Sequence, residues 1–360
     1  MNTNPSYIPT GPFNEAGLRK PFYPVTDPLK AYLVDHGRSV PLPLTYADLG
    51  HFDGMMPATT ADGRAGLWNS VLYRPSELED LHERLVDTYQ LLIADGRHIE
   101  HLRVASIDLC PYGNSQPFRI KILNQINDNH DYYYIKRTDA NRVYGLELEH
   151  LLSPNRINYI CHAGTIVEEH IIGVPGDAFI ADPGRYGAAL NAVRLSKEFI
   201  KFNERCFVRL LGDMRAYNFV VDVIHDLDQV QYRIRSIDFD QQSHEGRVRM
   251  YLPQFFKENY PYVRSAQETI SMETADQYRN EERALLGKRY KMSSDRVERL
   301  LQAMEADALS DASQLRELAD GLASHHQDDG FKRCTSMGAL LRRQLHTLMD
   351  KPAGRASTKM

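Results

Sequence analysis

The sequence has little cysteine, and its cysteines stand far apart. Only four occur in 360 residues, and none forms a C-x-x-C or C-x-x-H pair. Structural zinc sites need ligands at such short spacings, so the sequence gives no indication of zinc. Scattered cysteines are typical of a reducing compartment, and we expect a cytoplasmic protein. The four are Cys110, Cys161, Cys206 and Cys334.

The sequence also lacks a long apolar run. A membrane-spanning helix needs about 20 mostly apolar residues, and no segment approaches that length. The first residues, Met-Asn-Thr-Asn-Pro-Ser-Tyr, contain neither the basic nor the apolar region of a signal peptide. We therefore expect no membrane partner, although secretion by a route without such a signal is compatible with this sequence.

Neither sign of charge dominates the chain. The formal net charge is -5, with 25% charged and 42% hydrophobic residues, and no basic stripe occurs. This composition is ordinary for a soluble globular protein and predicts no nucleic-acid partner. A chain of this length suffices for about two domains, or for one large two-lobed domain with extensions.

Several catalytic signatures are missing as well. The sequence contains no G-x-S-x-G, no H-E-x-x-H and no G-x-G-x-x-G. These absences argue against a hydrolase with a nucleophile elbow, a zinc protease and a dinucleotide-binding enzyme.

The pattern of the first half predicts an extension followed by a strand-rich lobe. Residues 1–75 are rich in Pro, Gly and Tyr without a sustained period, so we expect an irregular extension. Residues 76–172 form the predicted lobe of one helix followed by a strand-rich segment. It begins with a helix between Ser76, which has capping-box spacing to Glu79, and Gly96. Alternating residues predict strands, interrupted by one helix from Asp139 to Leu152, at 102–109, 118–122, 132–136, 157–161 and 165–171.

The second half is predicted to be mainly helical. A Gly- and Pro-containing break at residues 173–176 opens this lobe, which extends over residues 173–350. A hairpin is expected at residues 219–237, and residues 351–360 are expected to be a flexible tail. The predicted helices cover 188–206, 269–286, 294–304, 314–323 and 336–349.

Two acidic loops follow the long helix predicted at residues 188–206. The first reads Leu-Gly-Asp213-Met-Arg215-Ala-Tyr-Asn218 and the second Ile-Asp238-Phe-Asp240. In spacing, and in the order of the elements around them, they resemble the protein-kinase-like superfamily, closest to its aminoglycoside-phosphotransferase-like branch. The resemblance covers about residues 102–241. It implies an α+β fold of two lobes, a small antiparallel-sheet lobe and a larger helical lobe.

The resemblance implies a role for each residue of these loops. Asp213 would be the base that orients an acceptor hydroxyl, and Arg215 would stabilise charge on the transferred group. Asn218 and Asp238 would hold Mg²⁺ between the nucleotide phosphates. Asp240 would contact a second metal ion, or equally would be a solvated charge or a helix N-cap. The alternative for Asp213 is a turn residue, because Gly-Asp is common in turns.

Lys136 ends a predicted strand that reads Tyr-Tyr-Ile-Lys. It resembles the kinase lysine that binds the α- and β-phosphates and is positioned by a carboxylate on the next helix. The resemblance offers Glu147 and Glu149 for that carboxylate and favours Glu147. The alternative is an ordinary edge-strand lysine.

Other segments would surround the nucleotide and the acceptor. The turn Gly113-Asn114-Ser115 occupies the place of the glycine-rich loop, although a plain hairpin turn explains it as well. Glu169 and His170 stand where the hinge of the family holds adenine. The aromatic segment 254–264 would line an acceptor pocket or belong to the core.

The resemblance therefore predicts an ATP- and Mg²⁺-dependent phosphotransferase acting on a hydroxyl of a small molecule or protein. Leu211 stands where the family often has His, and the hairpin before Asp238 is longer than usual. No Ala-Pro-Glu follows Asp240, so control by activation-loop phosphorylation is not expected. An inactive kinase-like interaction module and a nucleotidyl (AMP) transferase on the same fold are the alternatives.

Overall fold

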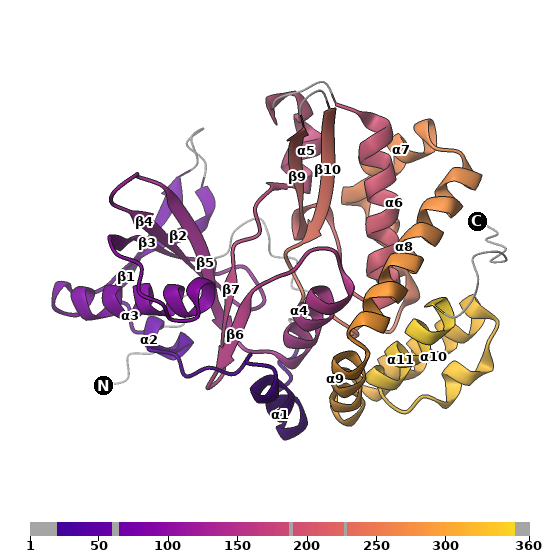
Figure 1. The fold of residues 1–360 in the computed structure, drawn as a ribbon, viewed down its shortest axis with the longest axis horizontal. Helices are drawn as coiled ribbons and strands as arrows, with labels where there is room; N and C mark the ends of the chain where they lie inside the picture. The colour runs from indigo at the N-terminus through magenta and orange to yellow at the C-terminus, as the bar shows by residue number, and fades with distance from the viewer. Residues whose placement is uncertain (1–19, 60–64, 187–189, 227–228, 350–360) are drawn as a thin grey trace, which may run out of the picture.

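A computed structural model describes residues 20–59, 65–186, 190–226 and 229–349 (Figure 1). It shows an α+β protein with a seven-stranded antiparallel sheet and a mainly helical part. The order of strands in the sheet is β1-β2-β3-β4-β5-β7-β6. The strands are β1 (Gly54–Thr59), β2 (Ala65–Leu72), β3 (Leu102–Leu109), β4 (Phe118–Asn124), β5 (His130–Arg137), β6 (Tyr159–His162) and β7 (Thr165–Glu169).

The strand β4 illustrates why alternating segments form this sheet. Phe118, Ile120 and Ile122 are buried, whereas Arg119 and Lys121 between them are only half-buried. Successive side chains of a strand point to opposite faces, so one face of β4 packs in the core. Helix α3 (Pro75–Ala94) covers this face, and its residues share a hydrophobic cluster with those of β4. All five predicted strands are confirmed as β3 to β7.

The start of α3 differs from its prediction. The helix begins at Pro75 with Arg74 as N-cap, so Ser76 lies inside the first turn and caps nothing. Proline is favoured at the first helical position, where its missing N–H and fixed φ cost nothing. The helix ends at Ala94, and the predicted stop residue Gly96 follows the C-cap Asp95, with a φ of +78° and its N–H donating to the Gln90 carbonyl at 3.0 Å.

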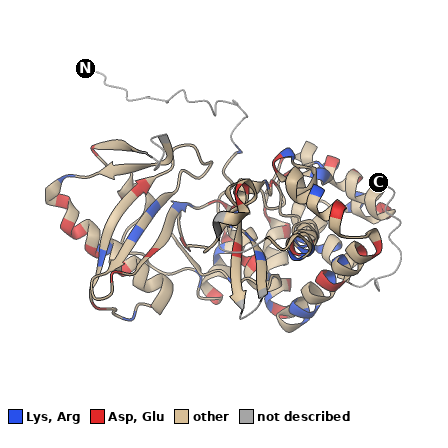
Figure 2. Cartoon of the chain, turned by 90° about the horizontal axis from the view of Figure 1, so that it is seen from above, with Lys and Arg blue, Asp and Glu red and all other residues tan. Residues whose placement is uncertain are grey.

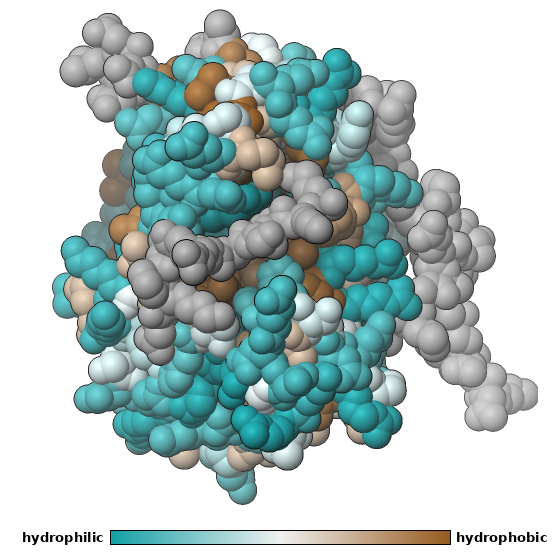
Figure 3. Space-filling view, turned by 90° about the vertical axis from the view of Figure 1, so that its right-hand side faces the viewer, coloured by the Kyte–Doolittle hydropathy of each residue, from teal (hydrophilic) through white to brown (hydrophobic). Residues whose placement is uncertain are grey.

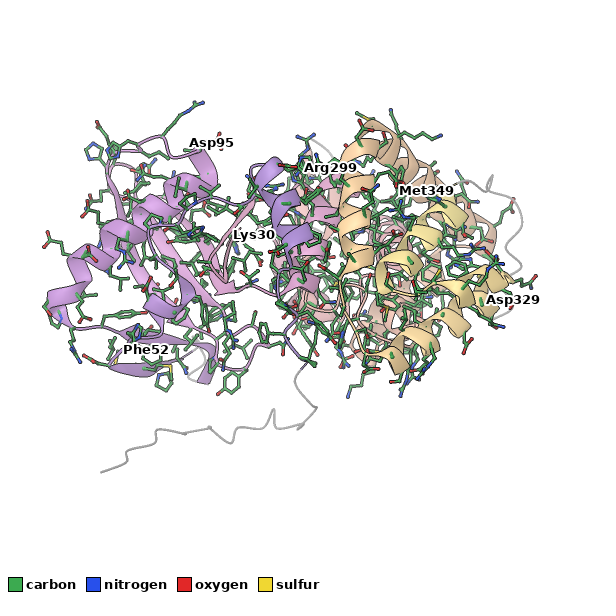
Figure 4. All side chains as sticks on the ribbon, turned by 90° about the horizontal axis from the view of Figure 1, so that it is seen from below. Lys30, Phe52, Asp95, Arg299, Asp329 and Met349 are labelled. Atoms are coloured by element: carbon green, nitrogen blue, oxygen red, sulfur yellow. The ribbon has the colours of Figure 1, made fainter. Side chains whose placement is uncertain are left out.

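The interpretation of residues 1–75 as irregular is wrong for most of the residues described there. Helices α1 (Asp27–Asp35) and α2 (Tyr46–Leu49) precede the hairpin of β1 and β2. Helix α2 has only four residues, and neither β1 (GMMPAT) nor β2 (AGLWNSVL) shows an alternation of apolar and polar residues. Helix α1 nevertheless buries Leu29, Tyr32 and Leu33, and Figure 4 shows it beside α9 (Ser294–Ala306), where Arg299 is labelled. Residues 1–19 lie outside the described residues, as does the predicted tail at 351–360.

The helical part follows the predicted order with two additions. Helices α5 and α7 were not predicted, and the helix expected from residue 269 begins at Met272 after the N-cap Ser271. A second sheet of order β10-β9-β8 contains the predicted hairpin. The elements are β8 (Val174–Pro175), α5 (Gly176–Ala181), α6 (Ala192–Arg209), β9 (Phe219–Asp226), β10 (Gln229–Ser236), α7 (Tyr260–Thr269), α8 (Met272–Met292), α9 (Ser294–Ala306), α10 (Ala312–His326) and α11 (Met337–Met349). Short 3-10 turns occupy Pro183–Tyr186, Ala216–Asn218, Val248–Tyr251, Pro253–Phe255, Lys257–Asn259 and Asp329–Arg333.

Helix α4 (Ala140–Leu152) lies between the large sheet and the helical part (Figure 1). Asp139 caps it as predicted, accepting a hydrogen bond from the Asn141 N–H at 3.2 Å. Nearly every residue of α4 is buried, because the helix contacts the sheet on one side and α8 and α9 on the other. The helix therefore brings its polar side chains to the junction of the two parts.

The surface carries mixed charge. Figure 2 shows basic and acidic residues interspersed along the helices, and the face in Figure 3 is largely hydrophilic with scattered apolar residues. Among the described residues, no helix is both long enough and apolar enough to cross a membrane.

Candidate functional site

The first acidic loop begins where α6 ends. Leu210 closes the helix in the left-handed conformation, and Asp213 follows with a φ of +56°. A left-handed φ is uncommon for a residue with a side chain and persists only where neighbouring contacts hold it. Here the Asp213 carbonyl accepts hydrogen bonds from the Arg215 N–H at 2.9 Å and from Asn218 Nδ2 at 2.8 Å.

Backbone hydrogen bonds place the second acidic loop against the first. The Gly212 N–H donates to the Gln241 carbonyl at 3.2 Å, and the Ile237 N–H donates to the Asn218 carbonyl at 3.0 Å. These two bonds lie before Asp213 and after Asn218, so they join the loops at both ends. The hairpin of β9 and β10 supplies the connection between them.

The Asp213 carboxylate is held by its neighbours. Arg215 Nε donates to Asp213 Oδ1 at 2.7 Å, and Asn218 Nδ2 lies 3.4 Å from Oδ2. Burial raises the pKa of Asp213 above its ordinary value, against the opposing effect of Arg215. Arg215 also pairs with Glu258 at 3.0 Å and lies over the Phe256 ring. Glu258 was not singled out from the sequence, because its partner is distant along the chain.

Arg142 of α4 connects the sheet to the second acidic loop. Its Nη1 lies 3.0 Å from Oε1 of Glu168 on β7, and its Nη2 lies 2.7 Å from Asp238 Oδ1. Its Nε lies 2.7 Å from Asp240 Oδ1. Lys136 of β5 completes the network, with its Nζ 2.7 Å from Glu168 Oε2. Two cations and three carboxylates are thus joined, with one negative charge in excess at neutral pH.

Burial and charge set the pKa values in this network. Burial, together with the adjacent Asp240 carboxylate, raises the pKa of Asp238. Burial also acts to raise the pKa of Asp240, but the Arg142 guanidinium outweighs it and holds that pKa below its ordinary value. For Lys136, burial and the positive charge of Arg142 lower the pKa of the ammonium group. The pKa values of the two loop aspartates therefore shift in opposite directions, because the effect of the guanidinium exceeds that of burial only at Asp240.

The predicted partner of Lys136 is wrong. Glu147 lies in a separate buried cluster, where it accepts hydrogen bonds from Tyr32 at 2.7 Å and Tyr159 at 2.6 Å. Glu149, the alternative, is buried against Arg209. Both glutamates of α4 point away from Lys136, which pairs instead with a strand residue, Glu168. The pairing of Lys136 with Glu168 could not be predicted from the sequence, because it depends on the register of β5 against β7.

The turn between β3 and β4 is compact. The Gln116 N–H donates to the Gly113 carbonyl at 3.1 Å, and Ser115 is buried. Asn114 Nδ2 is buried and has no hydrogen-bond partner among the described residues. A turn of this kind fits the plain hairpin alternative, while the unpartnered amide leaves a donor that a ligand could use.

Glu169 and His170 lie at the end of β7, next in sequence to the network residue Glu168. His170 Nδ1 is 2.9 Å from the Tyr134 hydroxyl, and the Tyr134 ring lies 5.4 Å from Lys136 Nζ. Burial raises the pKa of Glu169 and lowers that of His170. The structure thus places the predicted hinge close to Lys136 through Tyr134, which was not predicted to take part.

The aromatic segment at residues 254–264 divides between the two predicted alternatives. Phe256 and Tyr262 are buried, and the Tyr262 hydroxyl donates to the Gly176 carbonyl at 2.7 Å. Phe255 and Tyr260 are exposed. Two of the four aromatic side chains in this segment therefore belong to the core, and the other two face solvent.

A hollow of about 510 Å³ lies elsewhere, next to α11. Its arginines are already paired, Arg342 with Glu298 and Glu305, and Arg343 with Asp328. None of the predicted site residues lines it. The loops around Asp213 and Asp238 remain the candidate site, because the hollow brings no free charge or reactive pair together.

The residues at the candidate site fit a hard cation in donor type. Oxygen ligands suit Mg²⁺, and Asn218 and Asp238 each keep one oxygen to which no described residue donates a hydrogen bond. Among the described residues, no group of three or more His, Cys, Asp or Glu side chains is arranged to hold a metal. Any cation here would therefore depend on the Asn218 amide and on water or phosphate oxygens.

No protein-family model and no curated protein matches the sequence. The function of this chain must be argued from its residues and their geometry.

Proposed function

We propose that this chain is an ATP- and Mg²⁺-dependent phosphotransferase with a two-lobed protein-kinase-like fold. One observation carries the proposal. Lys136 from the sheet and Asp238 from the loop beside Asp213 belong to a single charge network, linked through Glu168 and Arg142. Phosphoryl transfer needs positioned charges and an oriented hydroxyl more than covalent chemistry.

Asp213 is the proposed base. Burial raises the pKa of Asp213 toward neutral pH, and a general base is more effective when its pKa lies near the working pH. The hydrogen bond from Arg215 holds the carboxylate in one orientation. Arg215 is itself neutralised by Asp213 and Glu258, so its part in stabilising the transferred group requires it to turn from one of them. The acceptor hydroxyl would approach from the side of the exposed Tyr217.

Asn218 and Asp238 would hold Mg²⁺, and Lys136 would contact the nucleotide phosphates. The cation would neutralise charge on the phosphates during transfer. Lys136 is buried and paired with Glu168, an arrangement that keeps its ammonium group in a fixed position. Glu169, His170 and the turn at Asn114 would border the base and phosphates of the nucleotide.

The test is Asp213→Asn. We expect at least a hundredfold loss of ATP-dependent transfer, since general-base catalysis contributes about 10²–10⁴-fold. Mass analysis of labelled nucleotide products, after incubation with a metabolite pool and with protein substrates, measures the transfer. Exposed Asp295→Asn on α9 is the matched control and should retain activity. Full activity of Asp213→Asn would show that the base is assigned wrongly, and transfer of AMP in place of phosphate would favour the nucleotidyl transferase.

A catalytically inactive, partner-binding module is the second candidate. The observation in its favour is that the groups proposed to bind metal and phosphate are already paired within the protein. Arg142 forms ion pairs with both aspartates of the second loop, and Glu168 forms one with Lys136. Thermal unfolding with Mg²⁺ and ATP separates the two candidates. A ligand at about 100 times its Kd stabilises the folded state by about 2.7 kcal/mol, so the enzyme should show a raised Tm. An unchanged Tm at millimolar MgATP would favour the inactive module.

A further inference from the structure

Arg142 holds three carboxylates at once. Each nitrogen of its guanidinium group faces a different one: Nη1 faces Glu168, Nη2 faces Asp238 and Nε faces Asp240. The side chain is only 3% exposed. A guanidinium is a permanent, planar cation, and three charge-assisted contacts hold this one in a single orientation.

The two aspartates that Arg142 contacts are not equivalent. Both lie 2.7 Å from the guanidinium, but the Asp240 side chain is only 6% exposed, whereas the Asp238 side chain is 34% exposed. Asp238 Oδ1 accepts hydrogen bonds from Arg142 and from the Asp240 N–H, which leaves Oδ2 for a ligand. A hydrated ion can therefore reach Asp238 and is kept from Asp240.

Asn218 completes the accessible side. Its Nδ2 donates to the Asp213 carbonyl, so the amide is oriented and its Oδ1 is left as a possible ligand. The single negative charge in excess in the network attracts one cation. A second divalent ion bound to Asp240 would lie close to the Arg142 guanidinium, which is 2.7 Å from the Asp240 carboxylate. Two positive charges so close together in a buried site repel each other strongly.

We propose that the Arg142 guanidinium takes the place of one metal ion, so that the site holds a single divalent cation, at Asn218 and Asp238. Asp240 is then a positioning residue that orients Arg142 and is not a metal ligand. This inference rests on the proposed function, because it concerns the same nucleotide site. It departs from the expectation that Asp240 contacts a second metal ion.

The experiment counts bound Mn²⁺ by electron paramagnetic resonance, with and without a non-hydrolysable ATP analogue. The intact chain should bind one Mn²⁺ at saturation. Arg142→Gln removes the fixed cation and should either admit a second Mn²⁺ or tighten the first by about tenfold or more. Arg142→Lys keeps a positive charge and should still bind one. Asp295→Asn controls for nonspecific binding to surface carboxylates.

Several results would overturn the inference. Two Mn²⁺ ions bound to the intact chain would do so, as would no Mn²⁺ at all, or an Arg142→Gln protein that binds Mn²⁺ as the intact chain does. If Arg142→Gln does not fold, as judged by circular dichroism, the number of Mn²⁺ ions bound by the intact chain and by Arg142→Lys tests the inference. Two ions bound to either protein would overturn it. Binding of the analogue, measured by its effect on Tm, is a separate result. Analogue binding with two ions would overturn this inference alone, and one ion without analogue binding would overturn the proposed function alone.

Discussion

Glu147 is a carboxylate with no exposure to solvent, and its four partners explain how it stays ionised. Tyr32 and Tyr159 donate hydrogen bonds to it, and Arg38 and Arg296 pair with it. Burial acts to raise the pKa of Glu147, but the two arginines and the hydroxyls outweigh it, and the pKa lies below its ordinary value of 4.5. An ionised residue so enclosed stabilises the fold only while all of its partners remain.

Replacing Glu147 by Gln should destabilise the protein by about 3 kcal/mol at pH 7, because it leaves two half-buried arginines, Arg38 and Arg296, without the buried counter-charge that they share. A depressed pKa stabilises the folded state above the unfolded pKa, and this stabilisation is lost as the pH falls through the folded pKa. The difference in the free energy of unfolding between the unaltered protein and Glu147→Gln should therefore shrink below pH 4.5. Urea unfolding at several pH values measures it. Exposed Glu273→Gln is the control, and a difference independent of pH would contradict the assignment.

Helix α4 packs tightly against the second acidic loop at Gly145. A Cβ atom added there would lie 2.9 Å from Phe239 Cβ and 3.2 Å from Gln242 Cβ. Real Cβ atoms do not approach other side chains so closely, so the helix or the loop would have to move. The same movement would disturb Arg142, which lies on the preceding turn of α4 and contacts Asp238 and Asp240.

We expect Gly145→Ala to destabilise the protein by about 1–3 kcal/mol through overpacking, despite the better helix propensity of alanine. Binding of nucleotide at the proposed site should weaken as well, because the loop that carries Asp238 is displaced. Gly287→Ala on α8 is the matched control. Its added Cβ would meet Met349 at an ordinary 3.7 Å, so a gain of about 0.5–1 kcal/mol is expected. Calorimetry of both variants checks this, and equal effects would contradict the close packing of α4.

At the scale of elements, local patterns could be predicted and tertiary partners could not. The alternation of β4 and the caps of α4 depend on neighbouring residues, so the strands and this helix followed from the sequence. The adjacency of the loops at Asp213 and Asp238 was implied by their resemblance to a known pattern. The role of Arg142 was not found, because its partners come from β7 and the second loop, which are distant from it along the chain. Helix α2 is a single turn, and β1 contains a proline and no alternation of apolar and polar residues, so neither shows a period that can be recognised.

Across the whole molecule, two hydrophobic clusters meet at β6 and β7. Ile160 and Val167 belong to the cluster under α3, whereas Cys161 and Ile166, their neighbours in sequence, belong to the cluster of the helical part. Successive side chains of these two strands point to opposite faces of the sheet, so each strand packs in both clusters. Arg296 of α9 adds a second link, through Glu147 of α4. The sheet and the helical part should for this reason lose their structure together.

Urea unfolding tests this coupling, because the chain offers one probe for each part. Its single tryptophan, Trp68, lies on β2 and reports on the sheet, while far-ultraviolet circular dichroism reports mainly on the helices. We expect the two transitions to coincide, which is the behaviour of a cooperative unit. Arg296→Met breaks the link to Glu147 and should lower both midpoints and draw them apart, whereas Arg264→Met, at an exposed ion pair on α7, should leave them together. Separate midpoints in the unaltered protein would show that β6 and β7 do not couple the two clusters.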